Sequence, residues 1–174
     1  MDPYTRNAFR EIYRNPWLAV EVHDMVHPNG VFGEHLLVVP PRPVAVLVED
    51  GDDFILTRQP RFAARREVVE VVKGGAGENE TPLDAAKREL REELGIVAAH
   101  WEPLGEIYEI PSIVANPIAM FLAGSLTHVE SAQEDVESIE PLRIAIDDML
   151  GGAAGLAIED AVTLAILFRY LMRA

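Results

Sequence analysis

Three features of the sequence predict an α/β fold. A strand-like segment at 67–73 leads through a glycine-rich loop into an amphipathic helix at 82–94. Apolar runs at 44–49 and 54–57 flank an acidic turn and predict a β-hairpin. Apolar residues at helical spacing in 158–172 predict a second helix that packs on the sheet. The length of 174 residues fits one compact domain with an adequate core.

The N-terminal 42 residues are predicted to form a separate unit ahead of a main domain at 43–174. Residues 3–14 are polar with scattered aromatics and predict either a short helix or a loose arm. The segments 17–26 and 30–39 predict two antiparallel strands, because a His-Pro-Asn-Gly turn signal lies between them. Closely spaced prolines then interrupt the strand pattern before the main domain begins.

The helix at 82–94 carries signals for both of its ends. Thr81 can act as the N-cap, and Pro82 stands where a first-turn proline is tolerated. Gly95 follows the last apolar position, where a left-handed glycine commonly ends a helix. The sequence therefore predicts a helix that begins and ends within this stretch.

Three carboxylates are predicted to share one face of this helix. Glu89, Glu92 and Glu93 adjoin its apolar stripe at about 100° per residue. A solvated charged face is the ordinary interpretation of such a run. The preceding loop favours a divalent metal instead, because Gly74 and Gly75 let the backbone approach the carboxylates, which are ligands that Mg²⁺ prefers.

Basic residues gather around the same stretch. Eight of the 15 Lys and Arg residues lie between positions 58 and 91: Arg58, Arg61, Arg65, Arg66, Lys73, Lys87, Arg88 and Arg91. For the arginines of Arg58-Gln59-Pro60-Arg61 two interpretations stay open: surface salt bridges, or bidentate contacts to substrate phosphates.

The chain after the helix predicts further strands at 101–110 and 118–123. The segment 130–140 holds five acidic residues in eleven. Taken alone it predicts a solvated loop, but its place after a core strand makes it a candidate source of one more carboxylate.

Composition limits the possible partners. The net charge of −14 argues against a nucleic-acid partner but leaves a small anionic substrate open. No apolar run approaches the roughly 18 residues needed to cross a membrane, and the N-terminus has no apolar signal core. The absence of cysteine excludes disulfides and thiolate chemistry. We therefore expect a cytoplasmic protein that does not contact the membrane.

The spacing of Gly74, Glu80 and the run 88–96 matches the complete Nudix box, so the chain resembles a Nudix hydrolase. It is most similar to the ADP-ribose pyrophosphatase-like group, which shares the strands after Asn15-Pro16-Trp17, the arginines before the box, and a proline at position 111. The resemblance implies a Nudix-type α/β/α sandwich with a mixed sheet. It also implies a small N-terminal antiparallel strand pair that joins two copies in a homodimer.

The resemblance also assigns roles by position. Glu89 and Glu93 would be the principal Mg²⁺ ligands, with Glu92 on the metal face and Mn²⁺ as a possible substitute. Arg88 would orient the glutamates, and Glu137 would supply the loop carboxylate, with Asp135 or Glu134 as alternatives. The remaining expected contacts are the metal-binding carbonyl of Lys73 and substrate contacts at Arg58, Arg61, Gly74 and Gly75.

The function implied is Mg²⁺-dependent hydrolysis of ADP-ribose to AMP and ribose 5-phosphate, with Glu137 or a box glutamate as the base. Alternative substrates are GDP-mannose and other nucleotide sugars, NADH and diadenosine polyphosphates. Relatives commonly carry Trp-Glu-Ile-Pro where this chain has Val69-Glu70-Val71-Val72, so recognition of the base is open. A nucleotide sensor of the same fold, or a structural dimerisation module, would be a different class of protein.

Overall fold

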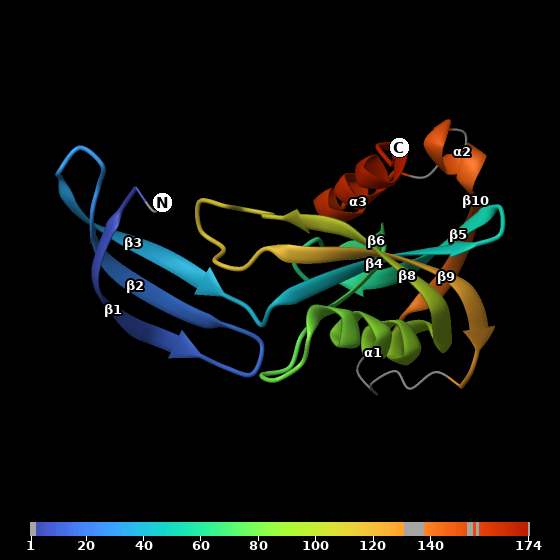
Figure 1. The fold of residues 1–174 in the computed structure, drawn as a ribbon, viewed down its shortest axis with the longest axis horizontal. Coiled ribbons are helices and arrows are strands. Elements are labelled where there is room, and N and C mark those ends of the chain that lie inside the picture. Colours follow the sequence, from blue (N-terminus) through green and yellow to red (C-terminus); the bar gives the residue numbers. More distant parts are fainter. Residues whose placement is uncertain (1–2, 131–137, 153–154, 156, 174) are drawn as a thin grey trace.

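A seven-stranded mixed sheet forms the body of the protein in this computed structural model, which describes residues 3–130, 138–152, 155 and 157–173 (Figure 1). The two central strands, β4 (Pro43–Asp50) and β9 (Ile118–His128), run parallel, and the other pairings are antiparallel. The strand order is β10-β5-β4-β9-β8, with β6 paired to β5 and β7 paired to β4. The remaining elements of the body are β5 (Asp53–Arg61), β6 (Arg66–Glu70), β7 (Val72–Gly75), α1 (Pro82–Leu94), β8 (Ile96–Ile107), β10 (Glu140–Ala145), α2 (Ile146–Leu150) and α3 (Ala161–Leu171).

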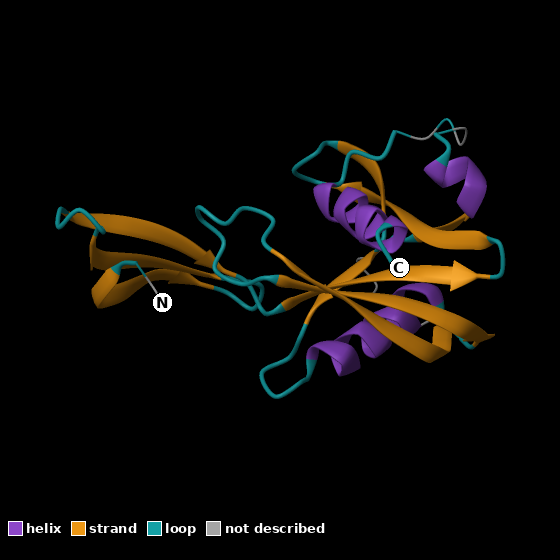
Figure 2. Ribbon diagram, turned by 45° about the horizontal axis from the view of Figure 1, so that its top comes forward, coloured by secondary structure: helices purple, strands orange, loops and turns teal. Residues whose placement is uncertain are grey.

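Helices α1 and α3 cover opposite faces of this sheet (Figure 2). Strand β4 explains why, because all residues from Val44 to Val48 are buried. Ala45 and Leu47 pack in the core under α3, whereas Val44, Val46 and Val48 pack in the core under α1. A strand that is buried on both sides needs a layer on each, which confirms the predicted α/β/α sandwich.

Helix α1 has the predicted bounds, and its caps account for them. The Thr81 hydroxyl accepts a hydrogen bond from the Asp84 N–H at 3.2 Å, and Pro82 occupies the first turn. Gly95 has φ 61°, and its N–H donates to the Arg91 carbonyl at 3.0 Å. The predicted hairpin between β4 and β5 is likewise confirmed, as is the C-terminal helix.

The N-terminal unit is a sheet of three strands, not a pair. Besides β2 (Ala19–Val26) and β3 (Phe32–Val39), it contains β1 (Thr5–Arg14), so the prediction of a helix or loose arm at 3–14 was wrong. Two register shifts against β2 break the period-2 pattern in β1, and every residue of β1 is exposed. Strand β1 therefore lacks the apolar alternation by which a strand is recognised.

The segment 66–75 changes partner along its length. Its first half, β6, pairs with β5, and its second half, β7, pairs with β4. Val71 lies at the crossing, between the two strands, and is fully buried. This strand delivers the chain to the glycine-rich loop and then to α1.

Candidate active site

Arg88 is the centre of the polar face of α1. Its Nε and Nη2 each donate to one oxygen of Glu80 at 3.0 Å, and Nη1 donates to both Glu89 and Glu92 at 2.8 Å. Nη2 also donates to the Gly75 carbonyl at 2.8 Å. One guanidinium thus ties the loop to the helix and holds two predicted metal ligands.

Charge pairing at Arg88 shifts the pKa of Glu80 and of Arg88 itself. The hydrogen bonds from Arg88, and then from the Gly77 N–H, hold the pKa of Glu80 below its ordinary value of 4.5. The pKa of Arg88 is raised, first by the hydrogen bond to Glu80. Both groups therefore stay ionised at neutral pH, and their attraction fixes the loop geometry.

Gly74 is required by the packing of Glu89 against the backbone. A Cβ added at Gly74 would lie 1.9 Å from the Glu89 carboxyl carbon and 2.1 Å from Oε1. Gly75 is also confined, since its Cβ would lie 3.1 Å from Pro41 Cβ. The predicted approach of the glycine loop to a carboxylate is thus present, and it is closest at Gly74.

The three glutamates differ in exposure. Glu93 is 4% exposed, whereas the side chains of Glu89 and Glu92 are 15% and 40% exposed. Within the described residues, no three His, Cys, Asp or Glu side chains converge as they do around a bound metal ion. The all-carboxylate donor set still suits a hard cation such as Mg²⁺.

The structure separates the predicted phosphate-binding arginines. Arg58 and Arg61 are three residues apart on the regular strand β5, so their side chains leave opposite faces. The Arg61 guanidinium pairs with buried Glu70, with 2.7 Å between Nε and Oε1. The salt-bridge interpretation thus describes Arg61 in this structure. Glu137 lies outside the described residues.

A buried ionic network beside the box was missed by sequence reasoning. Lys73 Nζ lies 2.7 Å from Glu70 Oε2 and 2.8 Å from Asp160 Oδ1. Burial would raise the pKa of Asp160, but hydrogen bonds from Lys73 and Thr163 outweigh it, so this pKa is lowered. A glutamate inside an otherwise apolar strand was the available signal, because such a charge needs a partner.

Two hollows adjoin the box. One, of about 800 Å³, lies between the N-terminal sheet and the glycine loop, and its lining includes Arg14, Arg42 and Gly77. The other, of about 420 Å³, lies over α1 and β8, and its lining includes Arg88 and Trp101.

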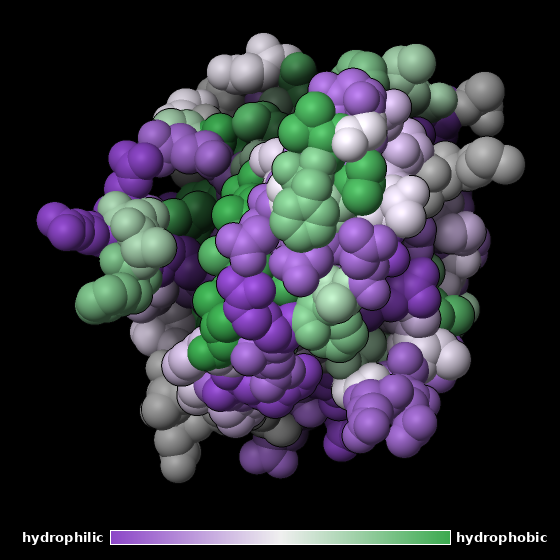
Figure 3. Space-filling view, turned by 90° about the vertical axis from the view of Figure 1, so that its left-hand side faces the viewer, coloured by the Kyte–Doolittle hydropathy of each residue, from purple (hydrophilic) through white to green (hydrophobic). Residues whose placement is uncertain are grey.

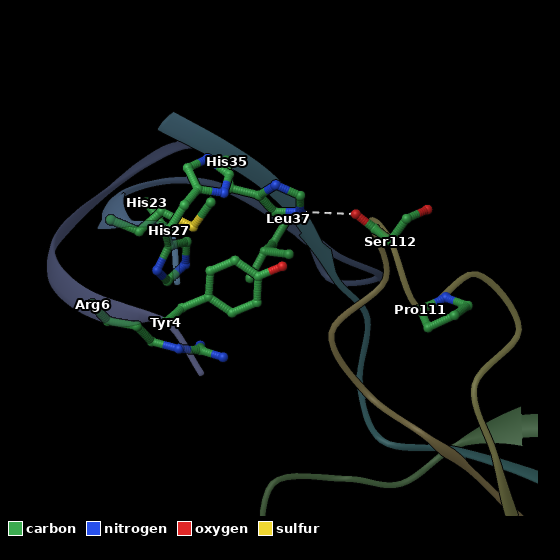
Figure 4. A pocket seen from close by; sticks show the side chains of 9 residues that line it. Tyr4, Arg6, His23, His27, His35, Leu37, Pro111 and Ser112 are labelled. Carbon is green, nitrogen blue, oxygen red and sulfur yellow. Dashed lines mark hydrogen bonds between the residues drawn. The ribbon is translucent and has the colours of Figure 1, made fainter. Parts of the chain in front are cut away.

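A third hollow, of about 350 Å³, lies away from the box, on the N-terminal sheet (Figure 4). His23 and His35 line it from paired positions on β2 and β3. His35 Nε2 donates to the Ser112 carbonyl at 2.8 Å, which ties the β8–β9 loop to the sheet. Pro111, the proline noted in the sequence, lies beside this contact.

The comparisons with known proteins agree with this arrangement. A family model described as NUDIX domain matches residues 39–149, which is more than half of the chain. The chain belongs to the Nudix family. The ADP-ribose pyrophosphatase of Bacillus subtilis (strain 168) is 30% identical over 167 residues, covering 94% of this chain and 90% of that protein.

Other relatives of this Nudix hydrolase carry different descriptions. The methanol dehydrogenase activator of Bacillus methanolicus is 26% identical over 164 residues, or 92% of this chain and 88% of that protein. A crystal structure of an ADP compounds hydrolase has a TM-score of 0.77 and 24% identity, covering 97% of this chain and 92% of that one. At this identity the match concerns the fold.

Nudix hydrolases generally use a divalent metal, in keeping with the carboxylates found here. In the described part of the chain, no helix is long and apolar enough to cross a membrane.

Proposed function

We propose that this Nudix hydrolase cleaves the diphosphate bond of ADP-ribose to give AMP and ribose 5-phosphate, with Mg²⁺ bound at the box glutamates. The observation that carries the proposal is the Arg88 centre, which gathers Glu89 and Glu92 beside the glycine loop. The relative from Bacillus subtilis, named for ADP-ribose hydrolysis and matched over nearly its full length, supports this choice of substrate.

The proposed metal ligands are Glu89, Glu92, Glu93 and the main-chain carbonyl of Lys73. Bound Mg²⁺ lowers the pKa of a coordinated water and neutralises charge on the phosphoryl oxygens, and Mn²⁺ suits the same ligands. The Arg88 guanidinium balances the carboxylates without metal, which limits the repulsion that like charges one turn apart would cause.

The protein's own groups then supply positioning and proton transfer. The oxygen of a water attacks one phosphorus, and the bond from that phosphorus to the bridging oxygen breaks. Glu137 or a box glutamate takes the water's proton as general base. Arg61, once its guanidinium shifts from Glu70, is the proposed contact to a substrate phosphate, with the main chain at Gly74 and Gly75 as further contacts. Arg58 leaves the opposite face of β5 and is not assigned to this site.

A substrate of this size has room beside the box. The hollow of about 800 Å³ next to the glycine loop is within the roughly 300–1,000 Å³ of small-molecule sites. Its lining includes Arg14 and Arg42 beside Glu78 and Glu80.

We further propose that residues 1–42 form a dimerising unit attached to a catalytic domain at 43–174. The N-terminal sheet has large exposed apolar side chains on β1 and β3, including Phe9, Ile12, Phe32 and Leu36. Seen from this end, hydrophobic and hydrophilic residues are interspersed on the surface (Figure 3). A homodimer would cover this surface, in line with the implied exchange of strands.

The test is a substrate panel with the purified protein and Mg²⁺: ADP-ribose, GDP-mannose, NADH, diadenosine polyphosphates and nucleoside triphosphates. We expect ADP-ribose to have the highest kcat/KM, with AMP as the nucleotide product by chromatography. If another compound has the highest kcat/KM, ADP-ribose is not the preferred substrate, but hydrolysis of a diphosphate bond remains the proposed reaction. Folded protein that is inactive on the whole panel with both Mg²⁺ and Mn²⁺ would favour a nucleotide sensor.

A further inference from the structure

Glu70 is a buried carboxylate that the proposed chemistry does not use. Its side chain is 2% exposed, yet both of its oxygens meet cations. Arg61 Nε lies 2.7 Å from Oε1, and Lys73 Nζ lies 2.7 Å from Oε2. A buried charge is costly unless it is fully paired, so the two cations fix where Glu70 lies and are fixed by it.

The network continues into the first turn of α3. Lys73 Nζ also donates to Asp160 Oδ1 at 2.8 Å. The other oxygen of Asp160 caps α3, because Oδ2 accepts from the Thr163 N–H at 2.8 Å and from its hydroxyl at 2.7 Å. One carboxylate oxygen of Asp160 thus binds Lys73, and the other caps the helix. The cap needs only the second oxygen.

Helix α3 also holds the strand at the point where it changes partner. The Val71 N–H donates to the Thr163 hydroxyl oxygen at 3.0 Å, and the hydroxyl keeps its own proton for Asp160. The first turn of α3 and its N-cap therefore contact segment 66–75 at two points. One is the Val71 main-chain N–H, and the other is the Lys73 side chain.

The segment that α3 contacts continues directly into Gly74. Lys73 precedes Gly74, whose backbone leaves no room between itself and the Glu89 side chain. A small shift of the main chain at Lys73 would thus move Gly74 against Glu89, and a change at Glu70 would move Arg61. Glu89 and the Lys73 carbonyl are proposed metal ligands, and misplacement of such a group by about 1 Å can cost about a hundredfold in rate.

We propose that Asp160 is a positioning residue: through Lys73 it sets the main chain at Lys73–Gly74 for the reaction. The inference rests on the proposed function for its link to catalysis. The network itself joins residues 87 positions apart and lies outside the Nudix box.

Asp160→Asn separates this role from simple helix capping. Asparagine caps a helix about as well as aspartate, so the bond to Thr163 is kept, while the charge that holds Lys73 is removed. Lys73→Met removes the same link from the other side. Glu159→Gln is the matched control, because Glu159 is adjacent to Asp160 and pairs with Arg66 at 2.8 Å on the surface.

Two measurements decide the proposal. In metal-free protein, we expect faster amide hydrogen exchange at Gly74 and Gly75 in both test variants and wild-type exchange in Glu159→Gln. With Mg²⁺ and the best substrate of the panel, we expect kcat of both test variants to fall about 10- to 100-fold. The double variant should be no worse than Lys73→Met, because Lys73→Met already removes the contact that Asp160→Asn weakens, together with the contact to Glu70.

A purely structural role gives a different result: a lower Tm, with exchange at Gly74 and Gly75 and kcat within twofold of wild type. That result would overturn the proposal. If wild-type protein hydrolyses nothing on the panel, the proposed function fails, and the exchange measurement still decides whether Asp160 positions this strand.

Discussion

The N-terminal sheet and the body both consist largely of β-strands, but different interactions stabilise them. Among residues 3–40, only Ala19 and Met25 are buried, and all ten residues of β1 are exposed. In the body, β4 alone buries five consecutive residues between two helical layers. The body therefore has its own core, whereas the N-terminal sheet relies on main-chain pairing and surface ion pairs such as Arg10–Glu34.

The difference teaches where each region's stability comes from. Burial of apolar area is the dominant favourable contribution to folding, and a single exposed layer gains little of it. A catalytic site needs rigid support, and the helix of the Nudix box packs on the buried core of the body. The N-terminal sheet is suited to association, because a second copy can supply the missing layer.

The largest expected effect is on the body, at Glu93. Glu93→Gln should keep the fold, because the two side chains have nearly the same shape, and should lower turnover by about a hundredfold or more through loss of a proposed metal ligand. Steady-state kinetics and circular dichroism measure the two quantities. A variant that keeps more than about a tenth of the wild-type rate would remove Glu93 from the mechanism.

The next effect tests how tightly the glycine loop is packed. Gly74→Ala places a methyl group 1.9 Å from the Glu89 carboxyl carbon, so we expect about 1–3 kcal/mol of destabilisation and a marked loss of activity. Gly124→Ala is the control, since its Cβ would meet nothing closer than 3.8 Å. Thermal unfolding compares the two, and equal Tm values would contradict the packing described for Gly74.

A third prediction concerns the N-terminal sheet. Ile12→Lys or Phe32→Lys should weaken the proposed homodimer about tenfold or more while the monomer stays folded, because both side chains are exposed in the single chain. Leu164→Lys, on the exposed side of α3, should not change association. Sedimentation at several concentrations measures the dissociation constant. Wild-type protein that is monomeric throughout would exclude the dimer.

The smallest expected effect is on the pH dependence of stability, through Glu80 in the glycine-rich loop. The pKa of Glu80 is lowered on folding, so its contribution to stability is complete above its ordinary value of 4.5 and is lost as the pH falls through the lower folded value. Glu80→Gln should cost about 1–2 kcal/mol at pH 7 and less in acid. Denaturant unfolding at pH 7 and pH 3 tests this, and a cost that is equal at both values would contradict it.

Local signals were sufficient for much of the body. The bounds of α1 follow from Thr81, Pro82 and Gly95, because capping depends on neighbours in the chain. The face shared by the box glutamates follows from helical periodicity alone. Strand β1 was not predicted, because its two register shifts disrupt the alternation of apolar and polar residues and all of its residues are exposed.

What the sequence by itself determined is therefore the chemistry of the box: its carboxylates, its glycine at the point of closest approach, and the helix that presents them. Only the tertiary structure decided the contacts between distant segments. Arg61 pairs with Glu70, and Lys73 donates a hydrogen bond to Asp160, which is 87 residues away in the sequence. The physical reason is that periodicity and capping act over a few residues, whereas a buried charge takes whichever partner the packing of the layers brings to it.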